Sequence, residues 1–522
     1  MEKFFEKTIS IIALISCVTV LLINIILKTN LGNYEIIKTN YCGYSEIALA
    51  IVTVCVVLLL SKVLNKIFLN KSKLKKVLLF SFVAILYLIV QIVWINTRYA
   101  TPAYDQEFVL SIAEKMYDNK YDEIGDWYTN YLERCPQQIS LSWFWSKMYK
   151  VFGVGNILNF EYANAVLNTL TFIGLILISK QFGQKYEINT FKTIVVSLLF
   201  ISLAMFSTFV YGDIPSITFC VYAVYFIMKY VQTKKIGYAL GTTILTSLAI
   251  IVRTNSYIFL IAIAIYLLLD LLSSEKREIL KKSLIFISVI IFSILPSMII
   301  KTNIQNKLNI DRENSIPTLA YLYMGMQESS KANGWYNFDI MGMTFDSQEE
   351  ANETYKKLIS ERLDYFAKNP IKFLEFYTFK IASMWAENTY AANLYNNSAY
   401  CGVSADRFKL KKNKEETEKL DKMVDNAYKP ISIIQKGIII FTFGMAIRIL
   451  IKYRKNISKE ILLLLLIFMG GFFFHILWEA KSRYILLYIV MLFPLVSINV
   501  PAVKFLKWKG MKKIEEFKEK VD

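Results

Sequence analysis

Long apolar runs separated by short polar segments recur along most of the chain. The runs are continuous rather than alternating and about 17–25 residues long, the length that crosses a bilayer core as a helix. They exclude a β-barrel, whose strands alternate apolar and polar residues. The fold class predicted is therefore all-α, that of a polytopic membrane protein. Twelve spans are expected, at about residues 9–27, 46–61, 77–95, 161–180, 191–210, 215–231, 237–252, 256–272, 283–301, 432–450, 460–477 and 484–503.

Two long polar segments, 96–160 and 302–431, interrupt the apolar runs. In the first, Phe108, Ile112 and Met116 recur at helical spacing, which predicts a helix lying on the membrane surface. Residues 139–152 are apolar and aromatic but too short for a span, and they predict a second surface helix.

Two more helices are expected in the second polar segment. Residues 371–386 predict a helix at the membrane interface, and residues 411–425 predict a solvent-exposed helix.

The net charge of +18 comes mostly from lysines and arginines between the apolar runs. These basic loops, and the tail after residue 504, fall on one side if both termini are cytoplasmic, as the positive-inside rule requires. That arrangement explains the charge better than nucleic-acid binding, for which no basic and aromatic motif is present. We expect a multi-pass protein of the cell membrane, with both polar segments extracytoplasmic.

Four regions follow from this topology. Residues 1–76 form an N-terminal two-helix membrane extension, and residues 77–301 form a membrane module whose first external loop is 96–160. Residues 302–431 form an extracytoplasmic cap, and residues 432–522 contain the last membrane helices and a basic cytoplasmic tail.

Six cysteines show no metal-like spacing with the single histidine. Cys42, Cys135 and Cys401 fall in segments expected outside the membrane. A disulfide among them stays open.

Two aspartates lie at expected external corners. Asp105 follows the third predicted span and opens a surface helix, where a carboxylate can accept a proton from a hydroxyl nucleophile. Asp213 lies in a tight corner between two spans, at a depth where a carboxylate is costly unless paired or wet. For both residues the alternative is a helix cap.

A third corner holds His475, Glu479 and Arg483 at a spacing of four residues, with Lys481 between them. If one helix continues through them, the three side chains share a face. An arginine fork suits a phosphate, and Arg253, at another external corner, suits the same anion. The alternative is a plain Glu479–Arg483 pair on a helix surface.

At these residues the chain resembles the GT-C superfamily of polyprenyl-phosphate-sugar-dependent glycosyltransferases, in the branch of protein O-mannosyltransferases and aminoarabinose transferases. The similarity covers about residues 77–495. Asp105 matches the family's acidic residue in the first external loop, and Asp213 matches a later corner aspartate. The late Glu and Arg-Tyr of the family resemble Glu479 and Arg483-Tyr484. A proline-led amphipathic stretch (136–153) and a basic-Phe-Gly pattern (180–183) also fit.

The resemblance implies inverting transfer of one sugar from a polyprenyl-phosphate donor to an extracytoplasmic glycan, lipid or protein. Asp105 would be the general base, and Asp213 would orient the acceptor or bind sugar hydroxyls. Arg483, with Lys481 or Arg253, would hold the phosphate. Glu479, His475 and Tyr484 would line the substrate and acceptor side.

No cofactor is firmly implied. A divalent metal stays an open alternative, although Gln106 stands where many relatives have a second carboxylate after the aspartate.

Three other classes stay open. A transporter or flippase would place its charged groups near the membrane midplane and often show inverted repeats. A polysaccharide polymerase or ligase would use a similar donor but transfer an oligosaccharide. A scaffold without catalysis is the last alternative.

Overall fold

The computed structural model describes residues 2–32, 35–68, 70–98, 102–311, 313–396 and 414–501. Within these ranges the regular structure is helical except for one two-stranded antiparallel hairpin, formed by β1 (Leu27–Leu31) and β2 (Ile37–Tyr41). The predicted all-α membrane fold is confirmed. The hairpin was not predicted, because each strand has only five residues and lies directly between two long apolar runs.

Nine helices are long and apolar enough to cross a membrane, counting only the described residues. They are α1 (Glu2–Ile26), α2 (Tyr44–Phe68), α3 (Lys73–Thr97), α7 (Ile157–Gln181), α10 (Asp213–Thr233), α12 (Tyr257–Leu272), α13 (Lys276–Lys307), α19 (Lys414–Tyr453) and α20 (Lys459–Leu477).

Two further predicted spans are helical but irregular. Helices α8 (Thr190–Leu199) and α9 (Ile201–Met205), with the short turn η4 (Phe206–Thr208), form a pair bent by 54°. Helix α11 (Ile236–Val252) is apolar but has only 17 residues.

The last predicted span, 484–503, is wrong as a continuous helix. Helix α21 (Ser482–Val490) ends after nine residues and is followed by the 3₁₀ turn η7 (Phe493–Ser497). Ile498 then pairs with Ile188, beyond the far end of α7. Irregular backbone at membrane depth is tolerated where protein surrounds it, and this segment is almost wholly buried.

Helix α19 joins two elements that the sequence pattern separates. The expected solvated helix near 411–425 and the span near 432–450 form one helix of 40 residues, in which Pro430 is internal. A proline inside a helix removes one backbone hydrogen bond and usually marks a boundary. Here the helix continues through it.

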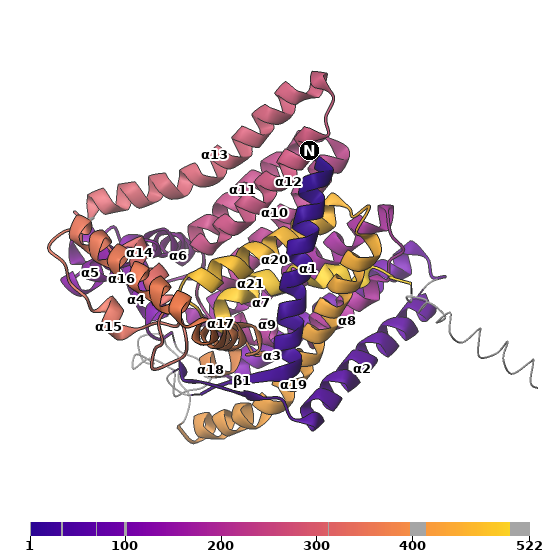
Figure 1. Ribbon diagram of the computed structural model, residues 1–522, viewed down its shortest axis with the longest axis horizontal. Helices are drawn as coiled ribbons and strands as arrows, with labels where there is room; N and C mark the ends of the chain where they lie inside the picture. The colour runs from indigo at the N-terminus through magenta and orange to yellow at the C-terminus, as the bar shows by residue number, and fades with distance from the viewer. Residues whose placement is uncertain are drawn as a thin grey trace, which may run out of the picture.

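The shorter helices gather at one end of the bundle. They are α4 (Asp105–Tyr117), η2 (Tyr121–Glu123), α5 (Asp126–Arg134), α6 (Gln138–Phe152), α14 (Thr318–Met324), α15 (Phe338–Met341), α16 (Gln348–Lys368), α17 (Pro370–Trp385) and α18 (Ala392–Tyr395). Figure 1 shows α4–α6 and α14–α16 together at the left, where the long helix α13 ends. The remaining short turns are η3 (Phe182–Gln184) and η5 (Thr254–Ser256).

The helix predicted from Phe108, Ile112 and Met116 is present as α4, and those predicted at 139–152 and 371–386 are present as α6 and α17. The apolar face of α4 does not lie on lipid, however. Ile112 and Met116 are buried in a small core with Ile139 of α6 and Ile304 of α13. The stripe therefore attaches α4 to the rest of the protein and fixes the position of Asp105 at its start.

Candidate functional site

Asp213 is the centre of a buried ion cluster. It is the first residue of α10 and is 3% exposed. One carboxylate oxygen lies 2.9 Å from Nη1 of Arg253, and the other lies 2.7 Å from Nη1 of Arg483. Because Arg253 directly follows α11 and Arg483 is in α21, the cluster ties three corners of the bundle together.

Aromatic rings enclose the two guanidinium groups. Arg483 lies 4.9 Å from the ring centre of Phe209, 5.2 Å from Tyr211 and 5.4 Å from Tyr395. The ring of Tyr484 lies 5.4 Å from the Arg253 guanidinium carbon. Such rings attract cations and exclude water, so they strengthen the ion pairs and hold both arginines in place.

The corner that carries Glu479 is not helical. Helix α20 ends at Leu477 and α21 begins at Ser482, so His475, Glu479 and Arg483 do not share one helix face. The interpretation that depended on a continuous helix is wrong. Instead the chain turns back, and Nδ1 of His475 lies 3.2 Å from the backbone oxygen of Glu479.

His475 itself is buried at the end of α20 and is 1% exposed. Its ring lies 5.6 Å from the ring of Tyr484. His475 therefore packs behind Tyr484 and supports the corner from inside.

Lys481 pairs with a residue that the sequence pattern did not single out. Glu35, in the turn of the N-terminal hairpin, is 4% exposed and forms ion pairs with Lys481 and, at 2.7 Å, with Lys331. The Tyr395 hydroxyl donates to the same carboxylate at 3.4 Å. Burial alone would raise the pKa of Glu35, but the two ammonium groups outweigh it and lower the pKa to about 2.

No motif marks Glu35 in the sequence. The one available signal was an acidic residue in a short external loop that also contains lysines. Its role depends on the hairpin, which the backbone amide of Ile37 anchors to the Lys331 carbonyl at 3.0 Å.

Asp105 lies at the exposed rim of this cluster. It begins α4, and one of its carboxylate oxygens accepts a hydrogen bond from the Tyr131 hydroxyl at 3.2 Å. The preceding residue, Tyr104, has a positive φ of 52°, an uncommon conformation for a bulky side chain. This turn directs the start of α4 toward the rim.

Asp105 and Glu479 are close enough for their carboxyl groups to affect each other electrostatically. The Glu479 side chain is partly exposed, but desolvation in the corner raises its pKa to about 7, an effect that Lys481 opposes and the Asp105 and Glu35 carboxylates reinforce. The pKa of Tyr211 is also raised, first by burial and then by Asp105. A carboxyl group with a pKa near neutrality is typical of proton-transfer sites.

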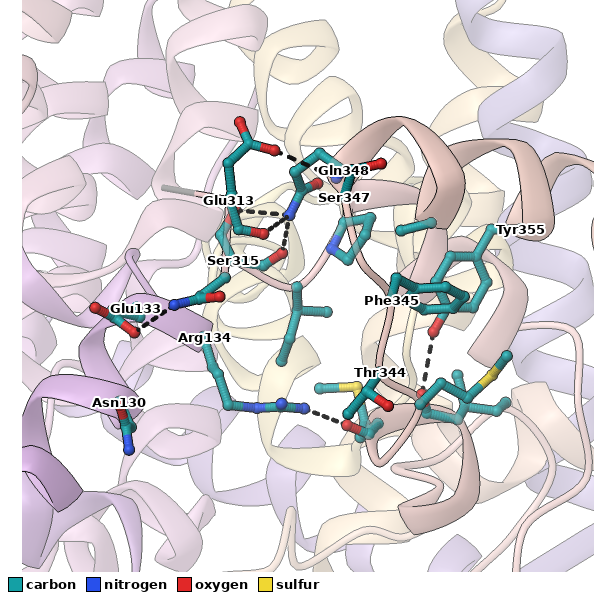
Figure 2. Close-up of a pocket in the computed structure, with 17 residues that line it drawn as sticks. Asn130, Glu133, Arg134, Glu313, Ser315, Thr344, Phe345, Ser347, Gln348 and Tyr355 are labelled. Atoms are coloured by element: carbon teal, nitrogen blue, oxygen red, sulfur yellow. Dashed lines mark hydrogen bonds between the residues drawn. The ribbon is translucent and has the colours of Figure 1, made fainter. Parts of the chain in front are cut away.

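A polar pocket of about 280 Å³ lies beside the rim, between α5 and the 313–355 region. Figure 2 shows Glu133 and Arg134 on one side and Phe345 and Tyr355 on the other, with Gln348 bonded to the Glu313 and Ser315 backbone. Arg134 donates to the Met341 carbonyl. Helix α5 connects the pocket to the site, because it also carries Tyr131, whose hydroxyl donates to Asp105.

Cys42 and Cys135 are free, and Cys401 lies outside the described residues. In the described part of the chain no three His, Cys, Asp or Glu side chains are grouped as metal ligands would be.

The structure thus brings together all eight residues singled out from the sequence, around one end of the bundle. They are Asp105, Asp213, Arg253, His475, Glu479, Lys481, Arg483 and Tyr484. Their contacts differ from those expected from the sequence. Arg253 and Arg483 share Asp213, and Lys481 is paired with Glu35.

The family comparison covers the middle of the chain. Residues 137–300 match the model of the family described as dolichyl-phosphate-mannose-protein mannosyltransferase. The match runs from just before α6 into α13 and includes Asp213 and Arg253, whereas Asp105, Glu479 and Arg483 lie outside it. No curated protein matches the chain significantly. The matched segment supports the resemblance to GT-C superfamily glycosyltransferases that the motifs predicted. The apolar helices are those of a multi-pass membrane protein.

Proposed function

We propose that the chain transfers one sugar from a polyprenyl-phosphate donor to a hydroxyl of an extracytoplasmic glycan, lipid or protein. The observation that carries this proposal is the convergence of Asp105, Glu479 and the Arg253–Asp213–Arg483 cluster at one end of the bundle. The description of the matched family supports a lipid-phosphate donor and a mannose-like sugar.

In the proposed reaction Asp105 removes the proton from the acceptor hydroxyl. The hydroxyl oxygen forms a bond to the anomeric carbon, and the bond from that carbon to the phosphate oxygen breaks. The electron pair stays on the phosphate, and the configuration at the anomeric carbon is inverted. Asp105 suits this role because it is exposed at the rim, where an acceptor can reach it.

The cations suit the departing phosphate. Arg253 and Arg483 share a single carboxylate, and so do Lys331 and Lys481, so each group of three has one positive charge in excess. Preorganised positive charge stabilises a developing phosphate anion more than a solvated side chain does. Asp213 is fully engaged by the arginines, so we assign it the role of holding them rather than of binding sugar hydroxyls.

Two pockets suit the ends of the substrates. A small apolar pocket of about 120 Å³ lies between α3, α9 and α19, lined by residues such as Trp94, Met205 and Ile431, and suits part of a prenyl chain. Trp94 donates to Asn396, the residue after Tyr395, so this pocket is close to the cations. The polar pocket of Figure 2 suits an acceptor that approaches Asp105.

The class of donor is tested by purifying the protein and identifying co-purifying lipids by mass spectrometry. A polyprenyl-phosphate-hexose or polyprenyl-phosphate-pentose is expected. A polyprenyl-diphosphate-oligosaccharide would instead favour the polymerase or ligase alternative. Uptake of a substrate into proteoliposomes without bond formation would favour a transporter.

The role of Asp105 is tested by Asp105→Asn, measured as transfer from the co-purified donor. The variant removes the proton acceptor, so transfer is expected to fall at least about 100-fold. Insertion and thermal stability should stay unchanged because the side chain is exposed. Asp118→Asn, an exposed aspartate just after the same helix, is the control and should transfer normally. Normal turnover by Asp105→Asn would remove Asp105 from the mechanism.

A further inference from the structure

A fully buried lysine outside the cluster contacts the corner that carries Glu479. Lys380, in α17, is 0% exposed. Its Nζ donates to the carbonyl oxygens of Ile476 and Trp478, each at 2.8 Å, and to that of Gly325. Burial lowers the pKa of Lys380 to about 7, whereas three carbonyl oxygens around Nζ favour the ammonium form. In that form all three N–H donors are used on backbone.

Two of these carbonyls belong to the end of α20. The last carbonyls of a helix have no partner within the helix and must find one elsewhere. A cation there is also favoured by the helix dipole. Lys380 therefore supplies the hydrogen-bond donors that the carbonyls at the end of α20 lack, at the point where the chain leaves α20 and turns toward Glu479.

Other contacts from the 302–396 region hold the same corner. The backbone amide of Ala480 donates to the Gly334 carbonyl at 2.7 Å. The rings of Tyr321 and Trp478 are stacked, with 5.9 Å between centres and planes 7° apart. Gly334 has a φ of 73°, and a Cβ there would lie 2.5 Å from Cε of Lys380, so the lysine stem is packed tightly against backbone.

We propose that Lys380 is a positioning residue, which holds the corner between α20 and α21 so that the partly exposed Glu479 stays in place beside Asp105. Its consequence for sugar transfer rests on the proposed function, whereas its effect on Glu479 does not. Through Lys380, the 302–396 region also controls the geometry of the Glu479 carboxyl group.

The test is an infrared titration of the Glu479 carboxyl band, identified by subtraction of the Glu479→Gln spectrum. In the intact protein the group should titrate near pH 7. Charged and titratable groups from several elements act on it or titrate beside it: Lys481, Asp105, Glu35, Lys331, Lys380, Cys135, Tyr321, Tyr336 and Tyr484.

The Lys380→Met variant distinguishes two ways in which Lys380 can affect the pKa of Glu479: by holding the corner in place, or by its positive charge alone. If Lys380 holds the corner, its loss exposes the Glu479 carboxyl group further to water, and the titration moves down by about one pH unit or more. If Lys380 acts only through its charge, removing that charge raises the pKa of Glu479. An upward shift or no shift therefore overturns the proposal.

Lys372→Met, in the exposed first turn of the same helix, is the matched control and should leave the titration unchanged. Lys380→Gln is the second variant, for the case in which Lys380→Met does not fold. Its amide can donate to some of the three carbonyls, so a smaller downward shift is expected and an unshifted band would contradict the proposal. Because the titration requires no turnover, its result is independent of whether the chain transfers sugar.

Discussion

At the scale of single residues, the buried charges are the most constrained part of the molecule. Asp213 neutralises neither arginine alone but bridges both, at 2.7 and 2.9 Å. Removing one member of such a buried group leaves an uncompensated charge, which costs far more than the intact pair contributes. Asp213 is therefore as important for folding as for any reaction.

Asp213→Asn is expected to destabilise the protein by about 3–5 kcal/mol, because two guanidinium groups then face each other without a carboxylate. The measurement is the apparent melting temperature in detergent. Asp105→Asn is the matched comparison, since it changes the same chemical group at an exposed position, and it should melt like the unmodified protein. Equal melting temperatures for both variants would show that the Asp213 cluster is not a structural necessity.

At the scale of elements, close backbone approach decides how the helices meet at the site. Gly325, at the end of α14, lies against the α20–α21 corner. A Cβ added there would lie 2.2 Å from the Leu477 carbonyl oxygen and 2.7 Å from the Trp478 carbonyl. These are backbone atoms, which cannot rotate away.

Gly325→Ala should therefore push the corner outward, lower the melting temperature and reduce transfer. Gly237→Ala is the control, because nothing lies within 4 Å of a Cβ at that position in α11. Alanine in a helix is favoured over glycine by about 0.5–1 kcal/mol, so this control should be neutral or slightly stabilising. A Gly325→Ala variant as stable and active as the Gly237→Ala control would contradict the close contact.

At the scale of the whole molecule, the short helices and the candidate site lie at the same end of the bundle (Figure 1). The orientation in the membrane follows from the lysines between the spans, which we expect to face the cytoplasm. If so, the site is extracytoplasmic, as a lipid-linked donor on the outer surface requires.

Cysteine labelling in intact cells tests this orientation. In a cysteine-free background, Asp122→Cys, in the first polar segment, should react with a membrane-impermeant maleimide. Lys71→Cys, between α2 and α3, should react only after the cells are permeabilised. The reverse pattern would place the site in the cytoplasm and exclude the proposed donor side.

The order of apolar and charged residues along the chain was enough to predict the class of the protein and most of the residues that meet at the candidate site. Apolar runs of membrane length give a helical bundle whatever their packing, because backbone hydrogen bonds must be satisfied within each span. Charges at span ends singled out Asp213, Arg253 and Arg483, because a charge at that depth is costly unless it is paired or wet. Asp105 was singled out because it opens a predicted surface helix.

The ion-pair and hydrogen-bond partners of these residues depend on the tertiary structure and could not be predicted from the sequence. Glu35 reaches Lys481 only because a hairpin outside any motif returns across the bundle, and Lys380 reaches α20 only because α17 packs beside it. The end of α20 at Trp478 likewise could not be predicted from the neighbouring sequence. The carbonyl oxygens there accept hydrogen bonds from a residue about a hundred positions away in the chain. Sequence patterns predict which charged and polar groups need a partner, whereas long-range packing determines which residue that partner is.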